Sequence, residues 1–343
     1  MSFKRYPQIY LIFSICLLAA SCKNNKEVDV SHVQVNVPIE RFDKELVALM
    51  PVQVSGKAPQ LKQKYGHFYA DYMESMLGVG PVTDTAYYNQ LRMVLTNKDY
   101  RELAAEVNRV FPDLQDRQDE LTDAFKHIRY YYPKQKLPRL ITFFSGFALQ
   151  TPVGNDYIGI GLDMFLGSDS KFYPALVQSI PQYISRRFTP ENITPRVLEG
   201  FIREDMFADK DADRSLLSKM VYNGKILYMM DAVMPAVADS LKIGYSSQQM
   251  EWANTYQPEV WAYFLGNNLL YETDYIKIQK YLTDAPFTPG IGEGSKSAPK
   301  LAVYTGWQIV KKYMDKNPGV TLQQLMSETD AQKILNGSKY KPR

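Results

Sequence analysis

Residues 138–145 read Pro138-Arg139-Leu140-Ile141-Thr142-Phe143-Phe144-Ser145, a run in which apolar, β-branched and aromatic side chains predominate. A second such run is Asp156-Tyr157-Ile158-Gly159-Ile160-Gly161-Leu162, and between the two lies Pro152-Val153-Gly154-Asn155, which is typical of a turn. Short runs of this composition, bounded by turn residues, predict strands. We therefore expect a small antiparallel β-sheet in the middle of the chain.

Helical patterns surround this sheet, because apolar residues recur three and four positions apart on both sides of it. A short extended segment at 33–37 is followed by Ile39-Glu40-Arg41-Phe42-Asp43, which is expected to open a helix ending near residue 50. Longer helices are expected at 60–77, 84–96, 99–111 and 114–131 before the sheet, and at 171–187, 195–207, 215–240, 246–271, 275–282 and 300–316 after it.

The fold class predicted by these patterns is mainly α with a small antiparallel sheet, of the α+β type. Hydrophobic residues make up 45% of the chain and aromatic residues 13%, as in ordinary globular proteins with a large core. We expect one globular domain over residues 31–343, with a helical N-terminal part at 31–135 and a second part at 136–343.

Residues 1–21 are expected to be a signal peptide, because Lys4 and Arg5 precede the apolar stretch 9–20. A helix of roughly 12 residues spans about 18 Å, which is short of the roughly 30 Å of a membrane core. The stretch ends in Leu18-Ala19-Ala20-Ser21-Cys22, which resembles the lipobox of bacterial lipoproteins. An ordinary secretory signal followed by an incidental cysteine is the alternative.

Cys22 is therefore the expected site of lipid attachment, and acyl chains on it would anchor the protein firmly to a membrane. Residues 22–30 are expected to form a polar tether of about 15 to 20 Å, which would keep the domain close to that membrane.

The expected mature chain offers little catalytic or metal-binding chemistry. Of the two cysteines, Cys16 would leave with the signal peptide and Cys22 would be acylated. The three histidines, His32, His67 and His127, have no second histidine four residues away, although helical zinc sites need that spacing. The Gly-x-Ser-x-Gly pattern of many hydrolases is also absent. We therefore expect no catalytic residue, no metal and no cofactor.

Charge patterning gives no sign of a nucleic-acid partner. The net charge is +3, and loss of Lys4 and Arg5 would leave 38 basic against 37 acidic residues, a net charge of +1. Glu199 and Arg203 lie one turn apart on the helix expected at 195–207, and an acidic stretch follows them. That stretch lacks the glycine and glutamate of a calcium-binding loop, so we interpret the region as a solvated helix end.

Several motifs together resemble the gliding-motility lipoprotein GldB family of Bacteroidetes, over essentially the whole chain. They are the lipobox, Ile39-Glu40-Arg41-Phe42-Asp43, Ile160-Gly161-Leu162-Asp163-Met164-Phe165-Leu166-Gly167, Tyr183-Ile184-Ser185-Arg186-Arg187-Phe188, Gly306-Trp307-Gln308-Ile309-Val310 and the ending Ile334-Leu335-Asn336-Gly337-Ser338-Lys339-Tyr340. The resemblance implies a noncatalytic lipoprotein of the cell envelope that supports gliding motility or type IX protein secretion through protein contacts.

The layout also looks like that of zincin-type metallopeptidases, in which a His-Glu-x-x-His helix and a later glutamate hold zinc. Pro181, Gln182 and Ser185 would stand in place of the His, Glu and His of that motif, and only Glu204 keeps the chemistry of a ligand. The resemblance implies a zincin-like scaffold that lacks its zinc motif. Its groove would be lined by Asp163, Gln182, Tyr183, Ser185 and Glu204, unless these are ordinary polar or packing residues.

Two hypotheses for function follow. The first is the noncatalytic envelope lipoprotein, and Lys23-Asn24-Asn25-Lys26 favours a periplasmic orientation, because surface-exported lipoproteins of these bacteria tend to carry acidic residues after the lipidated cysteine. The second is an envelope hydrolase, acting through carboxylates or a catalytic triad dispersed in the sequence, or a ligand-binding lipoprotein, that uses the groove near Asp163, Gln182 and Glu204. A hydrolase would need two groups with separated pKa values in one cleft.

Gly306, beside Trp307, is expected at a close contact between two helices. A larger side chain would then overpack the core. Gly306→Leu should accordingly cost about 1 to 3 kcal/mol of stability.

Overall fold

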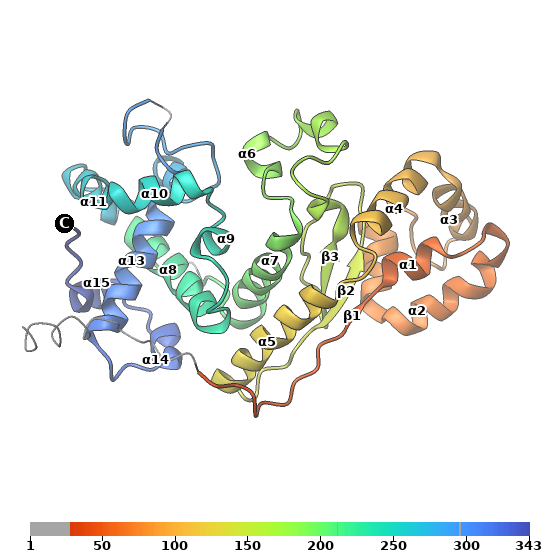
Figure 1. Cartoon of the computed structure of the whole chain (residues 1–343), viewed down its shortest axis with the longest axis horizontal. Coiled ribbons are helices and arrows are strands. Elements are labelled where there is room, and N and C mark those ends of the chain that lie inside the picture. The colour runs from red at the N-terminus through yellow and green to blue at the C-terminus, as the bar shows by residue number, and fades with distance from the viewer. Residues whose placement is uncertain (1–27, 211, 295) are drawn as a thin grey trace, which may run out of the picture.

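The computed structural model describes residues 28–210, 212–294 and 296–343. The expected signal peptide at 1–21, Cys22 and most of the expected tether at 22–30 lie outside the described residues. The described part is mainly helical with one three-stranded sheet, as the sequence predicts (Figure 1). None of its helices is both long and apolar enough to span a membrane.

The three strands are parallel, in the order β1-β2-β3. They span Ile39–Glu40, Arg139–Phe143 and Tyr157–Gly161. Ile39 pairs with Leu140, and Arg139 pairs with Tyr157. The positions of β2 and β3 therefore agree with the prediction, whereas the predicted antiparallel arrangement is wrong. The helix expected to begin at Ile39 is also wrong in its first turn, because Ile39 and Glu40 form β1.

The direction of β3 follows from the loop that joins it to β2. After Phe143 the chain crosses back, so that residues 150–154 run antiparallel to β3, with the Gly161 N–H donating to the Gln150 carbonyl oxygen at 2.8 Å. The predicted turn therefore reverses the chain between this return segment and β3, not between β2 and β3. Gly161 permits the close approach, because a Cβ there would lie 2.2 Å from the Leu149 carbonyl oxygen.

One face of the sheet is covered by the N-terminal helices (Figure 1). These are α1 at Phe42–Val47, α2 at Val54–Asp71 and α3 at Tyr87–Thr96, and a π-helical turn at Tyr72–Met76 continues α2. Ile141, Phe143 and Tyr157 on the strands share one hydrophobic core with these helices. Phe42 belongs to this core, and its ring centroid lies 4.9 Å from that of Tyr65.

The opposite face is covered by α4 at Lys98–Val110, α5 at Gln115–Tyr131 and α7 at Ile193–Gly200, which a π-helical turn at Phe201–Met206 continues. Leu140, Ile158 and Ile160 belong to the core on this side. The rings of Phe125 and Phe201, 5.5 Å apart, join α5 to the end of α7. These helices confirm the periodicity seen at 99–111, 114–131 and 195–207.

The long helix predicted at 171–187 is not formed. This region contains a 3-10 turn at Tyr173–Leu176 and one helical turn, α6, at Gln182–Ser185. Pro174 and Pro181 explain the difference, because proline lacks the N–H of a helix interior and clashes with the preceding turn. The zincin-like scaffold places its first motif in this region, and that scaffold stays a prediction.

Two long helices, α8 at Leu216–Val233 and α13 at Leu301–Lys316, pack against each other in the C-terminal half (Figure 1). A Cβ added at Gly306 would lie 1.9 Å from the Met220 carbonyl oxygen, and one at Gly224 would lie 2.3 Å from the Gly306 carbonyl oxygen. The helix backbones therefore touch, which confirms the close contact expected at Gly306. The remaining helices are α9 at Asp239–Ile243, α10 at Ser247–Thr255, α11 at Gln257–Gly266, α12 at Tyr275–Ile278, α14 at Leu322–Ser327 and α15 at Ala331–Ser338.

Candidate functional site

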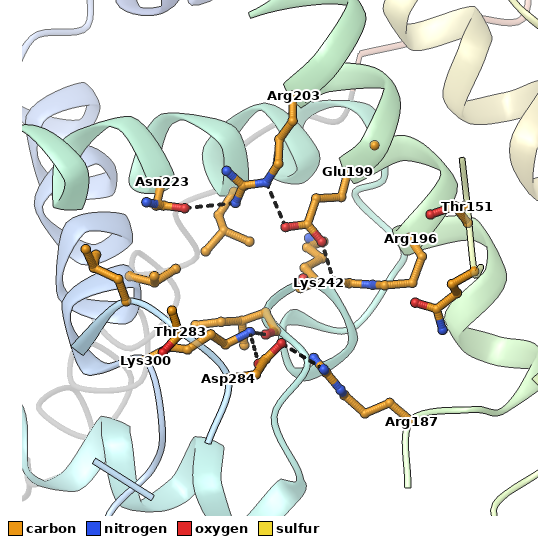
Figure 2. Close-up of a pocket in the computed structure, with 16 residues that line it drawn as sticks. Thr151, Arg187, Arg196, Glu199, Arg203, Asn223, Lys242, Thr283, Asp284 and Lys300 are labelled. Atoms are coloured by element: carbon orange, nitrogen blue, oxygen red, sulfur yellow. Dashed lines mark hydrogen bonds and ion pairs between the residues drawn. The ribbon is translucent and has the colours of Figure 1, made fainter. Parts of the chain in front are cut away.

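A cavity of about 520 Å³ lies between α7 and residues of α8, α9 and α13. This volume falls within the range of small-molecule binding sites. Side chains from distant parts of the chain meet in its wall (Figure 2). The charged ones are Arg187, Arg196, Glu199, Arg203, Lys242, Asp284 and Lys300.

One wall is a charge cluster on α7 and its continuation. Arg196, Glu199 and Arg203 lie three and four residues apart, so they share one face of the helix. Glu199 accepts hydrogen bonds from Nη1 of Arg196 and, at 2.9 Å, from Nε of Arg203. Arg203 also donates to Oδ1 of Asn223 on α8 at 2.9 Å. Because only 21% of the Glu199 side chain is exposed, these ion pairs are largely removed from water.

The opposite wall is built around Asp284. Its Oδ2 accepts a hydrogen bond from Nη2 of Arg187 at 2.9 Å, and its Oδ1 lies 2.9 Å from Nζ of Lys300. Lys300 immediately precedes α13 in a left-handed conformation, with φ +50°, which costs a non-glycine residue roughly 1 to 2 kcal/mol. Figure 2 shows Asp284 and its partners facing Glu199 across the open space of the cavity.

Lys242 is buried at the side of the cavity and belongs to a charge-balanced network. Its Nζ lies 2.8 Å from Asp231 and 3.4 Å from Asp239. The same two aspartates also bind Lys311, at 3.4 and 2.9 Å. Two lysines thus face two aspartates, so this network adds no net charge to the cavity.

The two carboxylates of the cavity stay ionised at neutral pH. Burial alone would raise the pKa of Glu199, but the neighbouring cations, above all Arg196 and Arg203, outweigh it and lower the pKa to about 2. Burial also favours the protonated form of Asp284. The nearby cations, among which Lys300 has the largest effect, outweigh burial and hold the pKa of Asp284 below its ordinary value. Carboxyl groups that are ionised near pH 7 do not donate protons there, so the site suits binding better than acid–base chemistry.

The five groove residues predicted from the sequence are not gathered in this cavity. Asp163 is fully buried behind the loop that follows β2. Gln182, Tyr183 and Ser185 lie on α6, where Gln182 is exposed and the other two are half-buried. Glu204 is exposed on the π-helical turn after α7 and lines a second cavity, of about 750 Å³.

Asp163 has a structural role in the loop after β2. Its Oδ2 accepts hydrogen bonds from the N–H groups of Ser145, at 3.0 Å, and Phe147, at 2.7 Å. The second bond holds Phe147 in a left-handed conformation, with φ +68°. The same loop leads into Gln150 and Thr151, which line the charged cavity. Asp163 therefore affects the cavity indirectly, by fixing the loop.

Asp163→Asn is expected to remove a pH dependence of stability. Burial raises the pKa of Asp163 from 3.8 to about 6, against the opposing effect of the N–H donors. The folded state thus holds the proton more tightly, so this group favours folding below pH 3.8 and the contribution is lost as pH rises to about 6. As pH rises from 3.8 to about 6, the free energy of unfolding of the wild type should fall by about 2 to 3 kcal/mol relative to that of Asp163→Asn.

Urea unfolding of both proteins at several pH values between about 4 and 7 measures this difference. Asp169→Asn, which changes an exposed carboxylate of the neighbouring loop, is the matched control and should keep the wild-type slope. The same slope in Asp163→Asn would show that folding does not raise the pKa of Asp163.

The described residues contain no group of side chains suited to bind a metal ion. In residues 28–343, positions 211 and 295 aside, no three histidine, cysteine, aspartate or glutamate side chains are grouped so that they could hold a metal ion. A catalytic zinc needs three protein ligands. Among the residues that the structure describes, Glu204 of the predicted groove is therefore not part of such a set of ligands.

The family model described as Gliding motility protein GldB matches residues 23–342. The chain belongs to this family. Membership in the GldB family associates it with gliding motility and, as a lipoprotein, with the cell envelope. The resemblance to the GldB family seen in the sequence is thereby confirmed. Neither a curated protein nor a solved structure matches the chain.

The charged cavity of this GldB family member was not predicted from its sequence. The spacing of Glu199 and Arg203 favours a solvated helix end when it is considered alone. The structure corrects this interpretation, because both side chains line a cavity closed by α8, α9 and α13. The pair between Arg187 and Asp284 joins residues 97 positions apart, and no local pattern reveals such a contact.

Proposed function

We propose that this member of the GldB family is a noncatalytic envelope protein that supports the gliding-motility or type IX secretion machinery through protein contacts. In this proposal it is anchored to a membrane by lipid on Cys22 and faces the periplasm. The ion-paired state of the charged cavity carries the proposal. Among the described residues that line this cavity, none is a histidine, cysteine or serine that could serve as base or nucleophile.

The competing hypothesis, an envelope hydrolase that uses carboxylates, needs one acid that is protonated and one that is ionised near neutral pH. The pKa values of Glu199 and Asp284 are both lowered, so neither supplies the protonated partner. Asp163 and Glu204 do not line a common cavity in the described structure. These observations favour the noncatalytic role.

We extend the proposal to a zincin-like scaffold without its metal. In this scaffold Pro181, Gln182 and Ser185 stand where zincins have the His, Glu and His of His-Glu-x-x-His. Glu204 is then the one position that keeps the chemistry of a zinc ligand, and a single carboxylate does not hold a catalytic zinc.

Protein contacts are supported by exposed apolar side chains at two places. Tyr271, Tyr275 and Ile276, in and before α12, are 66%, 52% and 77% exposed. In the N-terminal half, Val52 is 83% exposed and Met93 on α3 is 71% exposed. Large apolar side chains gathered on a surface are typical of interaction sites.

Photo-crosslinking in living cells tests the proposal. A photoreactive amino acid placed at Ile276 or at Val52 is expected to capture proteins of the motility or secretion machinery, identified by mass spectrometry. The same amino acid at Arg109, a position whose side chain is 68% exposed in a polar surface, is the matched control and should capture none of them. Equal capture at all three positions would contradict a contact role.

Cys22→Ala completes the experiment, because it should abolish labelling with radioactive palmitate and move the protein from membrane to soluble fractions. If the protein works at the membrane, this variant should also lose the specific crosslinks. Persistent palmitate labelling would refute lipid attachment at Cys22.

A further inference from the structure

We propose that the charged cavity binds a phosphate monoester, carried either by a soluble sugar or by a diacylglycerol lipid, as in phosphatidic acid. The inference goes beyond the contact role proposed above and does not depend on it. It rests on the charge, the hydrogen-bond donors and the size of the cavity.

The charge of the cavity is the first argument. With Lys242 balanced by its aspartates, four cations remain, Arg187, Arg196, Arg203 and Lys300, against the carboxylates of Glu199 and Asp284. Two positive charges are therefore left over in a partly buried space. A phosphate monoester carries about two negative charges near pH 7, so one such group balances the excess. A carboxylate or a sulfate ester would balance only half of it.

Arg186 strengthens this field from outside the cavity wall. Its Nη2 donates to the Gly244 carbonyl oxygen at 3.0 Å and to Oε1 of Gln249 at 2.8 Å, and neither acceptor carries a charge. The positive charges of Arg186 and the adjacent Arg187 repel each other. Burying like charges so close together is unfavourable unless an anion joins them.

The hydrogen-bond donors are the second argument. Nε of Arg196 is buried and has no hydrogen-bond partner among the described residues, and a buried donor without an acceptor costs stability. The planar guanidinium group of arginine can donate two parallel hydrogen bonds to two oxygens of a phosphate. On the opposite wall Lys300 presents its ammonium from a strained left-handed backbone, and strained residues concentrate at binding sites.

The size and the neutral lining indicate what the phosphate is attached to. A water occupies about 30 Å³ of liquid, so a cavity of about 520 Å³ has room for far more than an inorganic phosphate ion. Thr151, Asn223 and Thr283 add neutral hydrogen-bonding groups to the wall. Such groups suit the hydroxyls of a sugar or the ester oxygens of a phosphatidic acid.

Calorimetry on the full-length protein in a nonionic detergent tests the proposal with four soluble probes. Glucose 1-phosphate and dihexanoyl phosphatidic acid carry the phosphate monoester, whereas glucose and dihexanoyl phosphatidylcholine do not. Binding of glucose 1-phosphate alone would identify a soluble source, and binding of the phosphatidic acid alone a lipid source. Either result supports the proposal. Failure of both phosphate monoesters to bind more tightly than their controls overturns it.

Two variants give opposite expectations, which separates ligand binding from a purely structural role. Arg187→Gln should weaken binding of the phosphate monoester at least tenfold, while Asp284 stays paired with Lys300. Glu199→Gln removes a negative charge and should tighten binding. A structural ion-pair cluster without a ligand predicts a loss of thermal stability in both variants and no change in binding, and that outcome would overturn the proposal. Arg109→Gln, on the exposed face of α4, should bind as the wild type does.

Discussion

Gly306→Leu is expected to lower the free energy of unfolding by about 3 kcal/mol or more, the upper end of the usual cost of overpacking a core. Even the first side-chain atom would lie 1.9 Å from the Met220 carbonyl oxygen, which belongs to a helix backbone and cannot rotate away. To admit leucine, α8 and α13 must separate. That movement would disturb Trp307, which is fully buried and donates from Nε1 to Asp231 at 2.8 Å.

The midpoint and slope of urea unfolding, recorded by circular dichroism, measure this loss. Gly56→Leu is the matched control, because Gly56 lies in α2 and a Cβ there meets nothing within 4 Å. Leucine is the better helix former by about 1 kcal/mol, so the control should be neutral or slightly stabilising. If Gly306→Leu does not fold, Gly306→Ala tests the same contact with a smaller side chain. A wild-type midpoint in both Gly306 variants would show that the two backbones do not touch.

Glu199→Ala is expected to cost about 2 to 4 kcal/mol. Breaking a buried ion pair by removing one partner typically costs 3 to 5 kcal/mol, because the remaining charge is left without a partner. Here two guanidinium groups, of Arg196 and Arg203, would be left close together in the wall of the cavity. The expected loss of stability is smaller than this typical cost because the Glu199 side chain is 21% exposed, so solvent partly screens the ion pair.

The effect of Glu199 should depend on pH. Its pKa is about 2 in the folded state, against an ordinary value of 4.5. A lowered pKa contributes stability above pH 4.5, and this contribution is lost as pH falls from 4.5 towards 2. The difference between the wild type and Glu199→Ala should therefore shrink in acid. Glu102→Ala is the control: the side chains of Glu102 and its partner Lys171 are 46% and 59% exposed, so the loss should stay below about 1 kcal/mol.

Sequence patterns predicted the elements that depend on local spacing. The helices α4, α5 and α13 lie close to the predicted ranges because their apolar faces repeat every three to four residues. The direction of β3 could not be predicted in this way, because it depends on the path of the chain between residues 144 and 152. At 171–187 the apolar pattern predicts one long helix, but Pro174 and Pro181 prevent it from forming.

The candidate site was harder to predict, because its charged residues come from five separate segments. Arg196, Glu199 and Arg203 are visible in the sequence as one helix face. Whether that face meets water or protein depends on how α8, α9 and α13 pack, and no local spacing determines it. Asp163 was predicted to line a groove, but its carboxylate accepts hydrogen bonds from backbone N–H groups of the loop after β2.

The position of β1 has a consequence for the order of folding. Pairing Ile39 with Leu140 brings together residues roughly 100 positions apart, and closing so long a loop costs entropy before any strand contact compensates for it. The helices between them form from local contacts, so we expect them to fold first and the two-residue edge strand to join last. The N-terminal end of the described domain would then stay unattached while the rest of the domain takes shape.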